Sequence, residues 1–263
     1  MRPLLAAPFA VLALAACPAL AHTSYMLPST FDATDMPLVT VESSFTEDFF
    51  APQIAVDAED FHVLAPDGSR AEFETVTPLR QIVVLEAGLD ADGTYRLTTG
   101  ERLGRFSREA LMPDGEWIVL EDGEAAPDGA TGVYSIQTAT VADAYVSKGP
   151  LTRTAVDAGV GQFAIRPVTH PNDIFLGEGF EFELTLGEDP VANHAMTLYR
   201  EGGHYEEPAF ARNIVTDAQG HGRISFDRPG VYLLMTRHRA EAPAGAESDV
   251  RSYTTSLTFE VLP

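Results

Sequence analysis

The sequence predicts an all-β protein built from two β-sandwich domains in tandem. Three observations lead to this prediction. Short runs rich in Val, Ile, Phe and Thr recur along the chain, turns rich in Gly, Pro and Asp separate them, and one five-residue phrase occurs in both halves. A chain of 263 residues, 45% of them hydrophobic, has the size and composition of one large or two small globular domains.

The start of the chain has the pattern of a secretory signal peptide. An apolar stretch follows Arg2, and Ala19-Leu20-Ala21 supplies the small residues that signal peptidase requires. We therefore expect residues 1–21 to be removed, the protein to be exported to the periplasm, and the mature chain to begin at His22. No later stretch approaches 18 consecutive apolar residues, so no membrane span is expected.

A second interpretation of the same segment stays open. The residues from Leu14 to Cys17 also fit the lipobox of bacterial lipoproteins, in which the cysteine is lipidated and becomes the first residue. Lipidation at Cys17 would anchor the protein and would remove the free α-amine of His22. We prefer cleavage after Ala21, because the Ala-Leu-Ala site is good and a proline follows the cysteine.

Strands are predicted first between residues 22 and 150, which form the N-terminal domain of this interpretation. Turns such as Pro66-Asp67-Gly68 separate them. One segment, Arg105 to Met112, is a weak helical candidate. The predicted strands of this half are Leu38–Val41, Phe61–Leu64, Ala71–Thr77, Gln81–Glu86, Trp117–Glu121 and Val133–Thr140.

A second set of strands is predicted between residues 163 and 263, after a polar linker at residues 151–162. In Phe180–Leu186 the apolar residues alternate with Glu and Thr, as in a half-buried strand. The phrase Gly-x-Tyr-x-Leu occurs at Gly93–Leu97 and again at Gly230–Leu234, which favours two similar domains. The other predicted strands of this half are Met196–Tyr199, Ile224–Phe226, Val231–Thr236 and Ser256–Val261.

The charge excludes some classes of function. With 17 basic and 39 acidic residues the formal net charge is −22, which opposes binding to nucleic acid or to an anionic membrane surface. The sequence contains no Gly-x-Ser-x-Gly, P-loop or His-Glu-x-x-His motif, so no enzyme activity is predicted. An acidic protein attracts cations, and metal binding is the chemistry that the sequence leaves open.

Three of the seven histidines are predicted to be metal ligands. His22 would offer its ring and, after cleavage, its α-amine to one ion. His204 lies in an acidic, glycine-containing loop, and His238 follows a predicted strand. Imidazole binds nickel, cobalt, copper and zinc, so we expect these three side chains to converge on one transition-metal ion. The remaining histidines, which turns or exposed strand positions explain, are His62, His170, His194 and His221.

Several phrases resemble the family called domain of unknown function 4198. The resemblance covers essentially the whole mature chain and includes the Ala-His pair at the cleavage site. Members are described as periplasmic components similar to those of cobalt and nickel uptake systems. The phrases that carry the resemblance are Ala144–Gly149, Ile165–Asp173, Thr216–Gly220 and Pro229–Leu234. The last two also recur in immunoglobulin-like and transthyretin-like modules, so the resemblance implies sandwiches of that type.

The resemblance and the histidines together predict an exported protein that binds a transition-metal ion, nickel or cobalt by the resemblance, as an accessory to metal uptake. A membrane metal permease would be its protein partner. One alternative is an immunoglobulin-like interaction or scaffolding module without metal. Another is an enzyme in which His22 forms part of a copper-binding brace, which would require a second histidine at the same ion.

Overall fold

The computed structural model describes residues 22–263, and nearly all of its regular elements are strands. The exceptions among these residues are the one-turn helix α1 (Thr154–Asp157) and the 3-10 turn η1 (Gly203–Tyr205). The predicted all-β class is therefore confirmed. No helix in residues 22–263 is long and apolar enough to cross a membrane. The predicted signal peptide, its cleavage site and Cys17 lie outside the described residues.

The first sheet, sheet A, consists entirely of strands from the N-terminal half. Its order is β1-β2-β7-β6, with β3 paired to β2. The bounds are β1 Thr23–Pro28, β2 Leu38–Thr46, β3 Ile54–Ala55, β6 Thr75–Pro78 and β7 Val83–Gly88.

The second sheet, sheet B, has ten strands and draws them from both halves of the chain. Its order is β16-β15-β18-β19-β11-β8-β4-β5, with β9 paired to β11 and β10 to β9. The bounds are β4 His62–Leu64, β5 Arg70–Ala71, β8 Gly93–Thr98, β9 Arg102–Leu111, β10 Trp117–Leu120, β11 Gly132–Lys148, β15 Ala195–Arg200, β16 Ala211–Val215, β18 Gly230–Glu241 and β19 Val250–Val261.

The third sheet, sheet C, comes from the C-terminal half. It contains β12 (Phe163–Pro167), β13 (Phe180–Leu186), β14 (Asp189–Pro190) and β17 (His221–Ile224).

Sheets A and C cover opposite faces of sheet B. Along β11, Ala142 and Ala144 pack into a core with strands of sheet A, whereas Ala139 and Tyr145 pack into a core with strands of sheet C. Side chains alternate between the faces of a strand, so odd and even positions of β11 serve two different cores. Both cores are built on the same central strand.

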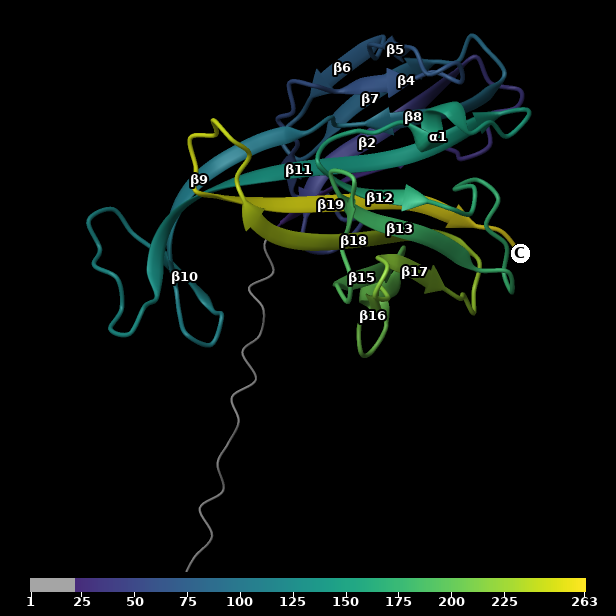
Figure 1. Ribbon diagram of the computed structural model, residues 1–263. Coiled ribbons are helices and arrows are strands. Elements are labelled where there is room, and N and C mark those ends of the chain that lie inside the picture. Colours follow the sequence, from purple (N-terminus) through teal and green to yellow (C-terminus); the bar gives the residue numbers. More distant parts are fainter. Residues whose placement is uncertain (1–21) are drawn as a thin grey trace, which may run out of the picture.

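The two halves join through parallel pairing of β11 with β19, which runs from Ile136–Val250 to Ala144–Thr258. In Figure 1 these strands lie side by side across the middle of the molecule. The boundary at residues 151–162 stays a prediction, but this segment is packed: it contains α1, and Ala155 and Val160 are buried beside Val141. Sheet B is continuous across that boundary.

The repeated phrase adopts the same geometry in both halves. Its glycines, Gly93 and Gly230, have φ angles of 133° and 132°, which favour residues without a Cβ. The hydroxyl of Tyr95 donates to the carbonyl of Ala91 at 2.7 Å, and that of Tyr232 donates to the carbonyl four residues before it at 2.8 Å. Such tyrosine corners are typical of sandwich domains, so the phrase marks equivalent strands, β8 and β18.

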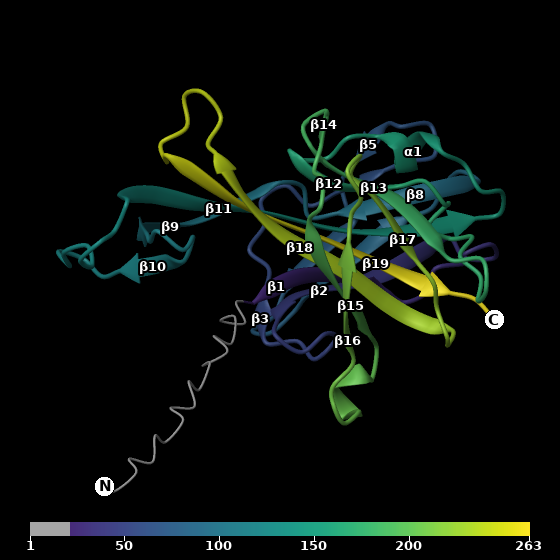
Figure 2. The same ribbon diagram turned by 60° about the horizontal axis from the view of Figure 1, so that its bottom comes forward.

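The weak helical prediction for Arg105 to Met112 is wrong, because this segment forms most of β9. Its backbone pairs with β10 on one side and with β11 on the other, which satisfies its hydrogen bonds without a helix. The pairing partners lie up to about thirty residues away in the sequence, beyond the reach of a local pattern. The strands β9 and β10 project from the body of the molecule in Figures 1 and 2.

Candidate functional site

His22 lies directly before β1, on the side of sheet B that sheet A covers. Its Nδ1 is 3.7 Å from a carboxylate oxygen of Glu47, and both side chains are 40% exposed. Its carbonyl accepts a hydrogen bond from the guanidinium of Arg237 at 3.2 Å. His22 therefore has one acidic neighbour and is held close to β18 through its backbone.

His238 lies on β18 next to Arg237, but its side chain points to the other face of sheet B. On β18 Leu233 packs against Tyr25 of sheet A, whereas Leu234 lies in the core that sheet C covers. Alternation along the strand places Arg237 with Leu233 and His238 with Leu234. The ring of His238 therefore lies on the opposite side of the sheet from His22.

His204 lies in the 3-10 turn η1, at the tip of the connection between β15 and β16. Its ring lies against that of Tyr205, with centroids 3.9 Å apart, and Tyr205 is 85% exposed. In residues 22–263 no group of three His, Cys, Asp or Glu side chains is placed to hold a metal ion. The expected convergence of His22, His204 and His238 is thus not found, because two lie on opposite faces of one sheet and the third on a separate loop.

The structure instead brings His238 together with His194. Their ring centroids are 5.2 Å apart and the rings meet nearly edge to face, at 78°. The pairing of β15 with β18 explains this contact, since Thr197 lies opposite Met235 and the same register, continued by three residues, sets His194 opposite His238. The two imidazoles come from the start of one strand and the end of its neighbour.

Hydrogen bonds fix the orientation of the His194 ring. Its Nε2 lies 2.9 Å from the carbonyl oxygen of Arg237 and 2.9 Å from the hydroxyl of Thr236. A carbonyl oxygen only accepts, so Nε2 carries the proton and Nδ1 keeps its lone pair. Metal-bound histidines commonly have this arrangement, with the second ring nitrogen donating to a carbonyl group.

Aromatic residues surround the two imidazoles. The ring of Phe163 lies 5.5 Å from His238 and 6.1 Å from His194, and Tyr253 lies opposite His238 on β19. Partial burial lowers the pKa of both histidines, and His194 lowers that of His238 further. Burial, followed by the negative charge of Glu101, raises the pKa of Tyr253. The two histidines are therefore neutral at neutral pH, which is the form that binds metal ions.

Sequence reasoning selected His238 but gave His194 no role. No local signal marks His194, which follows a turn residue, Asn193, with a φ of 52°. The pair becomes visible only when the strands beginning at Ala195 and Gly230 are paired in the correct register. One histidine lies just before a strand and the other lies near the end of the strand that pairs with it. This pattern could have suggested the contact if the pairing of the two strands had been predicted.

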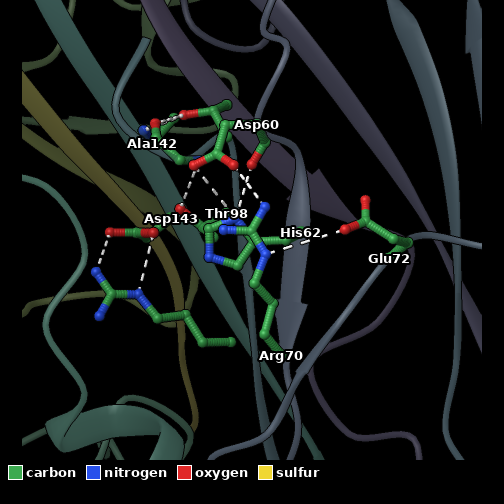
Figure 3. A network of polar contacts seen from close by, with 10 residues as sticks. Asp60, His62, Arg70, Glu72, Thr98, Ala142 and Asp143 are labelled. Atoms are coloured by element: carbon green, nitrogen blue, oxygen red, sulfur yellow. Dashed lines mark hydrogen bonds and ion pairs between the residues drawn. The ribbon is translucent and has the colours of Figure 1, made fainter.

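His62 is almost completely buried, so the expectation that it faces solvent from a strand is wrong. Its Nδ1 donates to the carbonyl of Asp60 at 2.7 Å, and the Asp60 carboxylate pairs with Arg70. Figure 3 shows this cluster with Asp143 nearby, and Asp143 forms an ion pair with Arg96. The contacts tie the segment before β4 to β5 and leave His62 well packed.

His170 and Asn172 form a polar network where the two halves meet. The His170 Nε2 donates to the carbonyl of Thr152 at 3.1 Å, and its Nδ1 accepts from the backbone of Asn172 at 3.2 Å. The amide of Asn172 donates to the carbonyl of Tyr145 at 2.9 Å and accepts from the hydroxyl of Ser147 at 2.9 Å. These residues brace the chain after β12 against β11, which agrees with the expectation that His170 belongs to a turn.

The comparison with family models settles the family. The model described as "Domain of unknown function (DUF4198)" matches residues 19–240, which is most of the chain. The chain belongs to this family. The phrases at Ala144–Gly149 and Ile165–Asp173, which carry the resemblance, are those that hold the network of Ser147, His170 and Asn172. Their role in this member is to join the two halves of the fold.

No curated protein matches the chain. Among solved structures, the chain is similar to the "D0-D1 domain of Intimin", with 11% sequence identity, 91% of this chain and 99% of that chain covered, and a TM-score of 0.22.

Proposed function

We propose that this protein is exported to the periplasm and binds a transition-metal ion of the nickel or cobalt type, as an accessory to metal uptake. The observation that carries the proposal is the contact between His194 and His238, whose ring centroids are 5.2 Å apart. Two imidazoles at this separation can bind one ion through a nitrogen of each ring, at about 2.0–2.1 Å per bond.

Three features support binding at this pair. Both pKa values are lowered, so protons compete weakly for the ring nitrogens at neutral pH. The carbonyl of Arg237 holds the His194 ring in one tautomer, so less ordering is needed when an ion binds. The net charge of −22 raises the concentration of cations near the protein.

Water would complete the coordination. Tyr253 lies opposite His238 in the β18–β19 ladder, but its raised pKa keeps the phenol protonated, which makes it a weak ligand. The pair therefore supplies two strong ligands and leaves other positions open to water or to a small chelator. An open site of this kind suits capture and release better than permanent storage.

His22 and His204 would not belong to this site. With its amine freed by cleavage, His22 offers that amine, its ring and the nearby Glu47 carboxylate as a separate set of donors. His204 is left as an exposed loop residue beside Tyr205. The ion would thus be bound by His194 and His238, and a membrane permease would receive it from that site.

Isothermal titration of the purified mature protein with nickel sulfate or cobalt chloride tests the site. We expect His194→Ala and His238→Ala each to weaken binding by at least about tenfold, because one imidazole alone binds weakly. His204→Ala and His221→Ala serve as controls and should bind as the unaltered protein does. Unchanged thermal unfolding must show that the variants fold.

Two results would contradict the proposal. One is the absence of saturable binding by the unaltered protein. The other is binding that His22→Ala abolishes while His194→Ala and His238→Ala leave it intact, which would move the site to the N-terminus.

A further inference from the structure

The projecting arm formed by β9, β10 and the first part of β11 ends in an unprotected strand edge. Within residues 22–263 β10 pairs only with β9, so its other side is an edge of the sheet. The four residues of β10 are Trp117, Ile118, Val119 and Leu120, without a charge or a proline among them. Proteins usually guard exposed edges with lysine, proline or bulges, because free backbone groups there invite pairing with another chain.

The hydrogen-bond pattern shows which backbone groups of β10 point outward. The backbone N–H of Met112 donates to the carbonyl of Glu116 at 2.8 Å, so these two residues form a hydrogen-bonded pair. Such pairs alternate along an antiparallel ladder, and Trp117–Leu111 and Val119–Glu109 are therefore non-hydrogen-bonded pairs. The N–H and C=O groups of Trp117 and Val119 point away from β9.

The carbonyl of Leu111 confirms this register from the other side of β9. It accepts a hydrogen bond from the backbone N–H of Thr131 at 2.7 Å, on the side toward β11. This is expected if Leu111 and Trp117 form a non-hydrogen-bonded pair, because the backbone groups of Leu111 then point away from β10. The side chain of Val119 is 64% exposed, so the face of the strand on which it lies is open to solvent. The edge can thus accept one more strand.

The charges around β10 select the partner. Asp114 and Glu116 precede the strand and Glu121 and Asp122 follow it, all of them exposed. In a second copy paired edge to edge, Glu116 of one chain would lie near acidic residues of the other, and such like-charge contacts are unfavourable. An extended segment with an apolar centre and basic ends complements the edge at both of its ends.

We propose that β10 is a docking edge that binds an extended, basic-flanked apolar segment of another protein as an added β-strand. Backbone hydrogen bonds to Trp117 and Val119 would supply much of the affinity, and the acidic residues on either side would select the charge of the partner. This surface lies on the arm, and its binding does not depend on the metal site of His194 and His238.

The test uses the purified mature protein and a synthetic peptide, acetyl-Lys-Val-Thr-Val-Thr-Val-Lys-amide. Trp117 is the only tryptophan of the chain, so its fluorescence reports directly on the edge. We expect a saturable change in that fluorescence. The same peptide with Glu at both ends, or with Pro in place of its central Val, should bind at least about tenfold more weakly.

Val119→Pro separates backbone pairing from simple apolar contact. The backbone N–H of Val119 points away from β9, so proline at this position removes a donor to the partner without breaking the ladder with β9. Val119→Thr keeps that N–H and is the matched control. We expect at least about tenfold weaker peptide binding for the proline variant and little change for the threonine variant. A double variant, Glu116→Lys with Glu121→Lys, should bind the Glu-ended peptide more tightly than the Lys-ended one. It provides a second test of the edge if the proline variant does not fold.

Three outcomes would overturn the proposal. The first is no saturable change with the Lys-ended peptide. The second is equal binding of Lys-ended and Glu-ended peptides by the unaltered protein. The third is a dimer in sedimentation experiments that Val119→Pro dissociates, which would assign the edge to a second copy of this chain.

Discussion

Arg96 of β8 and Asp143 of β11 form an ion pair inside the protein, with only 2% and 5% of these residues exposed. Two hydrogen bonds join them, from Nη2 to Oδ2 at 2.6 Å and from Nε to Oδ1 at 3.1 Å. The remaining Nη1 donates to the carbonyl of Ala158 at 2.6 Å. The pair therefore fastens the segment after α1 to the face of sheet B, where Tyr145 lies beneath the guanidinium.

Removing one partner of this pair should destabilise the protein strongly. Asp143→Ala leaves the Arg96 charge buried without its counter-ion, which typically costs about 3–5 kcal/mol of unfolding free energy. Chemical denaturation with urea measures this loss. Asp157→Ala breaks an exposed pair with Arg153 and should cost less than about 1 kcal/mol. Similar losses for both variants would contradict the assigned role of the buried pair.

Asn172→Ala should also destabilise the protein, by about 1–3 kcal/mol, because the Tyr145 carbonyl loses this donor and the Ser147 hydroxyl keeps only its contact with Thr94. Asn213→Ala, on an exposed position of β16, is the matched control and should change the unfolding free energy by less than about 0.5 kcal/mol. Denaturation curves of the two variants are compared under the same conditions. An asparagine that served only the local turn would show no such difference.

The stability should fall in mild acid, in part through His170. Burial lowers the pKa of His170 in the folded protein, so the unfolded chain binds the proton more readily. The contribution of His170 is therefore complete above the unfolded pKa of about 6.5 and is lost as the pH falls through the lowered folded value. Protonation of Nδ1 also removes the acceptor for the backbone of Asn172.

His170→Gln should show a shallower loss of unfolding free energy below about pH 6.5 than the unaltered protein, when both are measured by urea denaturation with a chelator present. The difference between the two curves isolates His170 from the other histidines. His221→Gln, at an exposed position, is the control and should follow the unaltered protein. Parallel curves for all three proteins would contradict the role of His170.

The sequence allowed the all-β class and most strands to be predicted, because alternation and turn residues are local signals. Phe180–Leu186 was predicted with the bounds that β13 has. The repeated Gly-x-Tyr-x-Leu phrase has the same turn geometry in both halves, since Tyr95 and Tyr232 each anchor the turn before their strand, and the two similar domains that it favours stay a prediction. Segment Arg105 to Met112 was assigned wrongly, because two distant partner strands decide its conformation.

The candidate site was harder to predict than the fold. His238 was selected from its place at a strand end, but its partner depends on the register between β15 and β18, which no local pattern fixes. The side of the sheet that each histidine faces also depends on register and on which sheet covers which face. The sequence therefore led to the expectation that His22 and His238 meet, whereas the structure brings Arg237, the neighbour of His238 on β18, to the His22 backbone.

Gly222→Ala should destabilise the protein through overpacking. Gly222 of β17 lies opposite Phe182 of β13, and a Cβ at Gly222 would lie 2.1 Å from the end of that phenyl ring. Phe182 is fully buried and stacks on Phe180, with centroids 5.6 Å apart, so the ring has little freedom to move. The expected loss of unfolding free energy is about 1–3 kcal/mol.

Gly159→Ala is the matched control: its Cβ would meet nothing within 4 Å, and it should be neutral or slightly stabilising, by up to about 1 kcal/mol. Combining Gly222→Ala with Phe182→Leu should cost less than the sum of the two single changes, because the smaller side chain makes room for the added methyl. Additive effects in this double-mutant cycle would show that the phenyl ring is not what excludes a side chain at position 222.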